Sequence, residues 1–162
     1  MAVNGLTLDI KATAEEFTLE AKLALPAQGV SIIFGPSGSG KTTLLRAIAG
    51  LAPCQGDIEF NGEHWQQDNK SKPAEQRPLA YVFQEASLFS HMSVEKNLAF
   101  AERYKLRQND ESPKEELSKD QLIALFNIEH TLMRMPESLS GGERQRVAIV
   151  RALLRQPKLL LM

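Results

Sequence analysis

Alternating apolar and polar residues mark the first segments of the chain. Residues 5–10 (GLTLDI) and 17–25 (FTLEAKLAL) place apolar side chains at every second position, which is typical of strands with one buried face. Residues 30–34 (VSIIF) form a mostly apolar, β-branched run that predicts a strand buried on both faces. Residues 56–60 and 79–83 are predicted as two further strands. The first half of the chain is therefore rich in strands.

Helical spacing dominates the remaining pattern. Residues 44–51 carry apolar side chains at positions i, i+3, i+4 and i+7, which predicts a helix. From 93 to 135 strand signals vanish and charged, helix-favouring residues prevail, with a polar linker predicted at 105–120 and a short helix at 121–126. A long helix is predicted at 141–155, ending before a proline. The order of elements predicts an α/β fold with an inserted helical block.

Composition adds limits to this pattern. The chain has 162 residues, a net charge of −1, 43% hydrophobic and 24% charged residues, which are values of a globular domain without a nucleic-acid partner. The single cysteine, Cys54, excludes an internal disulfide, and we expect it to be a half-buried residue near a loop. Residues 63–78 are expected to be a polar loop in which Trp65 covers an edge.

The ends of the chain also lead to expectations. No apolar stretch approaches the roughly 18 to 20 residues of a membrane span, and the first residues lack the basic and apolar parts of a signal peptide. We therefore expect a cytoplasmic protein that serves a membrane only through a partner. Residues 158–162 form an apolar run after a proline, and we expect the chain to be a fragment whose C-terminal part is missing.

A glycine-rich loop lies between the predicted strand at 30–34 and the predicted helix at 44–51. It matches G-x-x-x-x-G-K-[ST], in which backbone N–H groups and the helix N-terminus face phosphate, the lysine reaches the β- and γ-phosphates, and the hydroxyl binds Mg²⁺. The sequence therefore predicts a nucleotide site formed by Gly35, Pro36, Ser37, Gly38, Ser39, Gly40, Lys41, Thr42 and Thr43.

A second glycine motif opens the predicted helix at 141–155. Ser140 and Glu143 have the spacing of a capping box, which accounts for those two residues alone. It does not account for Gly141 and Gly142, because each glycine costs up to about 1 kcal/mol relative to alanine within a helix. Bare N–H groups at a helix start, beside a serine hydroxyl, predict a second phosphate site.

Three segments together resemble a known family, the ABC ATPases. GPSGSGKTTLL (35–45) is similar to their Walker A loop, YVFQEASLF (81–89) to their Q-loop, and LSGGERQRVAIVRAL (139–153) to their signature sequence. The stretch 77–100 is most similar to importers, above all to the molybdate-import ATPases. The resemblance covers essentially the whole chain and implies a P-loop NTPase core with N-terminal antiparallel strands and an inserted helical subdomain.

The resemblance implies site residues and partners. It implies ATP and Mg²⁺ as cofactors, Thr42 and Gln84 as metal-contacting residues, and a catalytic role for Gln84 at the attacking water. It implies a head-to-tail dimer in which the signature binds the ATP of the second ATP-binding subunit. Its further partners would be a membrane permease and, indirectly, a solute-binding protein, with the chain peripheral at the cytoplasmic side of the inner membrane. The signature residues are Leu139, Ser140, Gly141, Gly142 and Glu143.

The family pattern implies a division of the chain into subdomains, and this chain departs from the pattern at two places. Residues 1–92 would form the β subdomain and P-loop core, 93–155 the helical subdomain with the signature helix, and 156–162 the start of the Walker B strand. The Walker B Asp and Glu would follow Met162, so the chain alone is expected to be inactive. No aromatic residue occupies the usual adenine-stacking place, and Phe17, the nearest one, is expected to belong to the core.

The resemblance implies a subunit that powers ATP-driven import of an oxyanion, molybdate first, and two other functions remain as alternatives to it. A soluble P-loop kinase would use the first glycine loop but has no use for a second phosphate site at Ser140. A non-transport ABC ATPase of DNA repair or chromosome maintenance would share the signature, but it usually carries a long coiled coil between the two motifs. The insert at 85–135 is too short for that and has no sustained heptads.

Overall fold

The computed structural model describes residues 4–14, 17–68, 70–104 and 117–162. The chain forms two compact units, Met1–Arg77 and Pro78–Met162, and each is described by itself. The predicted linker at 105–120 lies outside the described residues up to position 116. The functional division at residues 92 and 155 stays a prediction.

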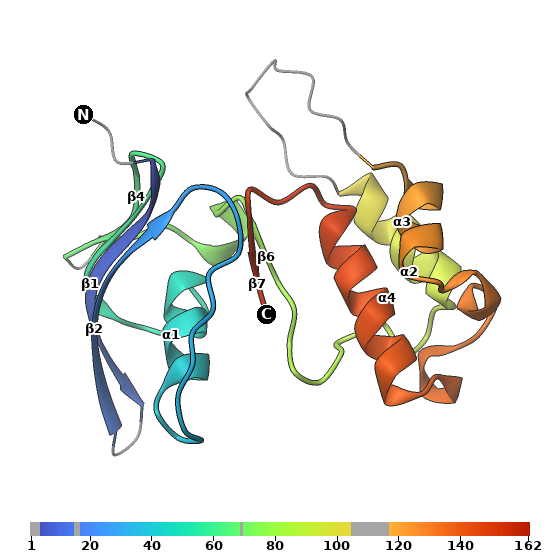
Figure 1. The fold of residues 1–162 in the computed structure, drawn as a ribbon, viewed down its shortest axis with the longest axis horizontal. Coiled ribbons are helices and arrows are strands. Elements are labelled where there is room, and N and C mark those ends of the chain that lie inside the picture. The colour runs from blue at the N-terminus through green and yellow to red at the C-terminus, as the bar shows by residue number, and fades with distance from the viewer. Residues whose placement is uncertain (1–3, 15–16, 69, 105–116) are drawn as a thin grey trace. The chain divides into compact units, whose positions relative to one another are not determined.

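The first unit is built on a five-stranded antiparallel sheet (Figure 1). The sheet order is β2-β1-β3-β4-β5, and β1 and β2 pair along their whole length, from Gly5 opposite Pro26 to Ala14 opposite Phe17. The strands predicted at 5–10, 17–25 and 56–60 are confirmed. The strands are β1 (Gly5–Ala14), β2 (Phe17–Pro26), β3 (Gln55–Phe60), β4 (Glu63–Gln67) and β5 (Lys70–Ser71).

Helix α1 (Lys41–Ile48) packs on this sheet, begins three residues before the predicted 44–51 and ends before Leu51, which is exposed rather than buried. Leu44, Ala47 and Ile48 are buried, as are Leu6, Leu8 and Ile10 on the facing side of β1. The apolar side chains that repeat every second residue in the strand and about every 3.6 residues in the helix thus pack in one core. Cys54 is free and half-buried, as expected.

The segment 63–78 was wrongly predicted as a polar loop. It contains β4, β5 and a 3₁₀ turn, η1 (Ala74–Gln76). Trp65 does not cover an edge but is fully buried, with its ring centroid 4.8 Å from that of Phe60. Arg77 is buried beside it and donates to the Trp65 carbonyl oxygen and to the carbonyl oxygens of Ala47 and Ile48 at the end of α1. Polar residues in this segment therefore satisfy buried carbonyl groups.

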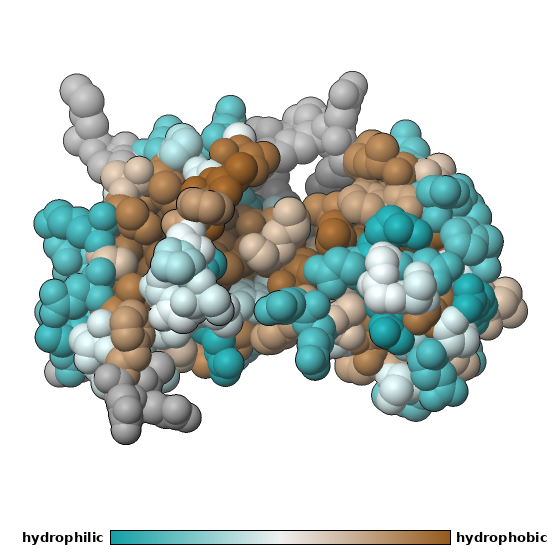
Figure 2. Space-filling model, turned by 60° about the horizontal axis from the view of Figure 1, so that its bottom comes forward, coloured by the Kyte–Doolittle hydropathy of each residue, from teal (hydrophilic) through white to brown (hydrophobic). Residues whose placement is uncertain are grey.

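The predicted strand at 30–34 is also wrong. Residues 30–36 have no regular secondary structure, and Val30, Ile32 and Phe34 are 88%, 85% and 97% exposed. A strand buried on both faces needs hydrogen-bonded neighbours, and no described strand pairs with this segment. Figure 2 shows that apolar side chains, in brown, reach the surface of the molecule on the face it displays.

The second unit joins a short parallel sheet to a helical block. Strands β6 (Leu79–Tyr81) and β7 (Leu159–Leu161) are parallel, with Leu79 opposite Leu159, which confirms the α/β class. The strand predicted at 79–83 is two residues shorter in the structure. The helical elements are α2 (Val94–Arg103), α3 (Lys119–Leu125), η2 (Glu129–Thr131), η3 (Pro136–Ser138) and α4 (Gly141–Leu153).

The helical block has its own apolar core. Helices α2, α3 and α4 contribute buried side chains to one cluster. The α4 side chains Ala148 and Ala152 pack on Ala80 in β6 and on Val82, the residue that follows β6. The signature helix α4 is therefore held between the helical block and the sheet of the same unit (Figure 1). None of the described helices has the length and apolar character needed to span a membrane.

Candidate functional site

The P-loop, residues 35–42, is open to a ligand at the start of α1. Gly40 is the N-cap residue with φ 85° and ψ 8°, and no side chain among the described residues caps this helix. Gly38 also has a positive φ, 80°. The first N–H groups of a helix have no partner within the helix, and no acidic residue occupies the first turn of α1. This geometry suits a bound anion.

The ammonium group of Lys41 lies across this loop. Its Nζ donates to the carbonyl oxygens of Gly35 and Pro36 at 2.8 and 2.7 Å, and reaches Ser39 Oγ at 3.4 Å. No carboxylate pairs with it in the described part of the chain. The cation is thus kept at the mouth of the loop by neutral acceptors, which an anionic oxygen would replace with a stronger, charge-assisted bond.

The loop residues that the sequence singled out are accessible. Ser37, Gly38, Ser39 and Thr42 are exposed, and Thr43 is half-buried. Thr42 lies in the first turn of α1, the turn whose N–H groups have no partner within the helix.

Phe17 is not a core residue, contrary to the expectation. It is 42% exposed, and a Cβ placed on Gly40 would lie 2.9 Å from Phe17 Cε1. The first residue of β2 therefore packs directly on the P-loop. The positive φ and the nearby ring both disfavour a side chain at position 40.

The signature segment, residues 139–143, is closed by its own side chains. Leu139 is buried and anchors the segment. Ser140 is the N-cap of α4, and its N–H and hydroxyl both donate to Glu143 Oε2 at 2.7 Å. Glu143 N–H donates back to Ser140 Oγ at 3.3 Å, which completes the predicted capping box. Gly141 and Gly142 remain exposed, and a Cβ on Gly141 would meet no atom within 4 Å.

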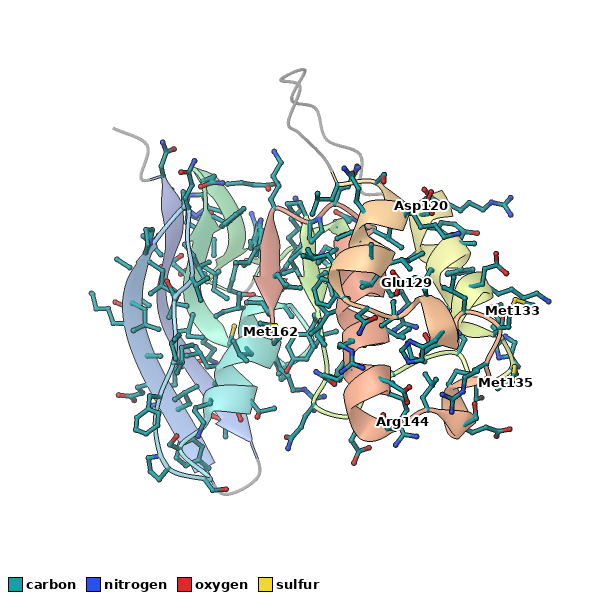
Figure 3. All side chains as sticks on the ribbon, turned by 45° about the vertical axis from the view of Figure 1, so that its right-hand side comes forward. Asp120, Glu129, Met133, Met135, Arg144 and Met162 are labelled. Carbon is teal, nitrogen blue, oxygen red and sulfur yellow. The ribbon has the colours of Figure 1, made fainter. Side chains whose placement is uncertain are left out.

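Two further residues hold Glu143, and sequence reasoning missed them. His130 Nε2 lies 3.1 Å and Arg134 Nη1 3.3 Å from Glu143 Oε1. The bonds from Ser140, then that from His130 and the charge of Arg134, lower the pKa of Glu143 to about 2. Figure 3 labels Met133 and Met135 on the segment that carries Arg134, and Arg144 in α4. No sequence signal links positions 130 and 134 to 143, because only folding brings them together.

Gln84 lies in an exposed stretch after β6, in the second unit. The stretch borders a groove of about 390 Å³ whose walls include Phe83, Phe89, Phe100 and Tyr104. The rings of Phe89 and Phe100 meet edge to face at 5.1 Å between centroids. Gln84 and the signature thus belong to one unit, whereas the P-loop belongs to the other. Among the described residues no group of three or more His, Cys, Asp or Glu forms a metal site.

Comparison with protein families gives one decisive match. The model of the ABC transporter family matches residues 19–162, nearly nine-tenths of the chain. The chain belongs to the ABC transporter family. The matched range includes both glycine motifs, at 35–42 and 139–143; their assignment as the Walker A loop and the signature, and the roles of the individual residues, stay predictions.

Curated relatives of this ABC chain include molybdenum import ATP-binding proteins. One from Albidiferax ferrireducens is 46% identical over 98% of the chain and 42% of the relative. Another, from Thiobacillus denitrificans, is 51% identical over 90% of the chain and 39% of the relative. The chain thus spans less than half the length of these relatives.

Solved structures support the fold of this ABC chain. The ATP-binding subunit of an ABC transporter matches 97% of the chain and 65% of its own length with a TM-score of 0.73 at 24% identity. An ATP-binding cassette in a dimeric post-hydrolysis state with ADP and Pi bound matches 96% of the chain and 72% of its own length, with a TM-score of 0.68 at 26% identity. The predicted ABC ATPase core is confirmed at the level of the fold.

Proposed function

We propose that this chain is the ATP-binding part of a motor subunit that powers import of an oxyanion, molybdate first, through a membrane permease. The observation that carries the proposal is the pair of helix starts with bare glycine backbones: the uncapped P-loop with Lys41, and the self-capped signature at Ser140. The relatives named for molybdenum import support the choice of substrate.

The P-loop residues would hold the triphosphate of ATP. Lys41 Nζ would exchange its carbonyl acceptors for β- and γ-phosphate oxygens, and the first N–H groups of α1 would bind the same anion. Mg²⁺ would be held in part by the Thr42 hydroxyl, with Gln84 as a second contact that also orients the attacking water. The metal would neutralise charge that develops on the transferred phosphoryl group.

The ring of Phe17 offers the nucleotide an aromatic face beside the loop. It is exposed and packs on Gly40, so a base stacked on it would lie next to the phosphate site. Phe17→Ala should weaken ATP binding several-fold, since stacking on one ring contributes about 1 kcal/mol. Binding of inorganic triphosphate should not change, and equal weakening of both ligands would assign Phe17 to the loop structure instead.

The signature would bind the γ-phosphate held by a second subunit in a head-to-tail dimer. Ser140, Gly141 and Gly142 are exposed, as this role requires. Ser140→Arg in the whole subunit should abolish ATP-dependent dimerisation and leave nucleotide binding by the monomer nearly intact. Analytical ultracentrifugation with and without ATP measures the first effect and a fluorescent ATP analogue the second. Loss of monomer binding would mean that both motifs act on one nucleotide.

The aromatic groove next to Gln84 would receive a segment of the permease from the cytoplasmic side of the membrane, with a solute-binding protein on the opposite side. Phe83, Phe100 and Tyr104 are each about 40 to 54% exposed on its walls. Tyr104→Glu should weaken permease association and spare ATP binding, because it places a charge on an apolar surface. Recovery of the permease at the wild-type level in a pull-down would count against this groove.

A further inference from the structure

Asn97 in α2 is a fully buried polar residue that the proposed ATP chemistry does not use. Its amide nitrogen donates to the carbonyl oxygens of Phe89, Met92 and Ser93 at 3.1, 3.0 and 3.0 Å. Its amide oxygen accepts from the N–H of Phe89 at 2.8 Å. One side chain thus fixes the backbone of the segment 89–93, which links Gln84 to α2.

Arg151 reaches the same segment from the signature helix. Its guanidinium donates to Asn97 Oδ1 at 3.4 Å and to the carbonyl oxygen of Ser87, and lies 5.2 Å from the ring centroid of Phe89. No carboxylate partner of Arg151 occurs among the described residues. Burial lowers the pKa of Arg151, and the neighbouring Arg155 contributes less. The guanidinium is therefore committed to backbone and amide oxygens of this segment.

A second set of bonds joins the start of α2 to the segment before the signature. The N–H groups of Val94 and Glu95 donate to the carbonyl oxygens of Arg134 and Leu132 at 3.0 and 2.9 Å. Arg134 in turn donates to Glu143, the partner of the signature serine. The start of α2 is thus tied both to Arg151 in the fourth turn of α4 and, through Arg134, to the first turn of α4.

We propose that Asn97 and Arg151 are positioning residues that make the segment 84–93 and the signature end of α4 move as one body. The inference rests on the proposed function, in which Gln84 and Ser140 act on nucleotide. A shift of the segment that borders the aromatic groove would then reach the signature through a packed helix and directional hydrogen bonds rather than through diffuse contacts. A core amide with a purely local role would instead fix 89–93 alone.

Hydrogen exchange of the chain in the absence of nucleotide tests this coupling. Arg151→Lys keeps the charge but removes the two-pronged donor geometry. We expect exchange to become roughly tenfold faster both in 87–93 and at the N–H groups of Ser140, Glu143 and Arg144, as for the loss of about one hydrogen bond. Arg103→Lys, the same substitution at an exposed residue of α2, is the control and should leave the hydrogen-exchange rates of both segments unchanged. Acceleration confined to 87–93, or none, would overturn the proposal.

A measurement on the wild-type chain keeps the test valid if Arg151→Lys unfolds. With low urea concentrations, segments that open together show the same opening free energy and the same urea dependence. Equal values for the N–H groups of Phe89 and Glu143 support the proposal, and clearly different values overturn it.

ATP turnover by the whole subunit separates this inference from the proposed function. Asn97→Asp keeps an acceptor oxygen for the N–H of Phe89 and removes the two N–H donors that reach the carbonyl oxygens of Phe89, Met92 and Ser93. We expect kcat to fall roughly tenfold with an unchanged KM for ATP, because the P-loop is untouched. A wild-type subunit without turnover would contradict the proposed function and leave the exchange results as evidence on the coupling. Normal turnover in both Asn97→Asp and Arg151→Lys would contradict the coupling alone.

Discussion

The P-loop and the signature segment begin their helices in opposite ways. At the P-loop, the N-cap residue Gly40 is in a left-handed conformation and, within the described residues, no side chain caps the helix, while Lys41 donates only to neutral oxygens, among them two carbonyl oxygens. At the signature, Ser140 and Glu143 satisfy each other, and His130 and Arg134 hold the carboxylate. In the proposed function the open helix start of the P-loop would bind its anion directly, whereas the signature would complete a site on another subunit and exchange its cap bonds for the ligand.

Lys41→Ala is the substitution with the largest expected effect on the difference between the two helix starts. Removal of the cation should weaken MgATP binding by roughly 100-fold, since a hydrogen bond to a charged group contributes about 1.5–3 kcal/mol. Titration with a fluorescent ATP analogue measures it. Lys22→Ala removes another lysine of the same unit, one that pairs with Asp9 at the surface, and should not alter binding. Equal affinity of Lys41→Ala and wild type would refute the open-loop assignment.

Alanine at the two glycine sites should have opposite effects on stability. Gly40→Ala places a Cβ at φ 85° and 2.9 Å from Phe17, and should lower the free energy of unfolding by about 1–2 kcal/mol. Gly141→Ala meets no atom within 4 Å and should raise it, by up to about 1 kcal/mol. Urea denaturation distinguishes the two. A destabilised Gly141→Ala would show that glycine is needed there for folding and not for a ligand.

Loss of the signature cap should have an intermediate effect. Ser140→Ala removes the oxygen that accepts from Glu143 N–H and should cost about 1 kcal/mol of stability. Ser118→Ala removes an equivalent capping box from α3 and is the matched control. Both variants should lose similar stability in thermal unfolding, but only Ser140→Ala should impair ATP-dependent dimerisation of the whole subunit. Equal dimerisation of the two would argue against a ligand role for Ser140.

The smallest expected effect is a pH dependence at Glu143. Its pKa of about 2 in the folded chain lies below the ordinary value of 4.5, so the ionised carboxylate stabilises the fold above pH 4.5. This contribution is lost as the pH falls from 4.5 towards 2. The stability difference between wild type and Glu143→Gln should therefore be largest at neutral pH and shrink over that window. NMR titration of the Glu143 carboxyl carbon should give a midpoint near 2, and a midpoint near 4.5 would contradict the bonding network.

The sequence by itself determined the elements whose signals are local. Alternation predicted the strands β1 and β2, the spacing of Ser140 and Glu143 predicted the capping box of α4, and the glycine pattern at 35–42 predicted the loop that precedes α1. In each case the residues that make the structure are neighbours along the chain or repeat with its period.

Only the tertiary structure decided which residues are buried and which polar groups meet. Val30–Phe34 carries a strand-like pattern but has no pairing neighbour in the described structure, while Trp65, in a polar stretch, is enclosed by Phe60 and Arg77. His130 meets Glu143 across 13 positions and Arg151 meets Asn97 across 54. Burial and hydrogen bonding between distant segments depend on where the whole chain places them, because one polar side chain gives no periodic signal of its partner.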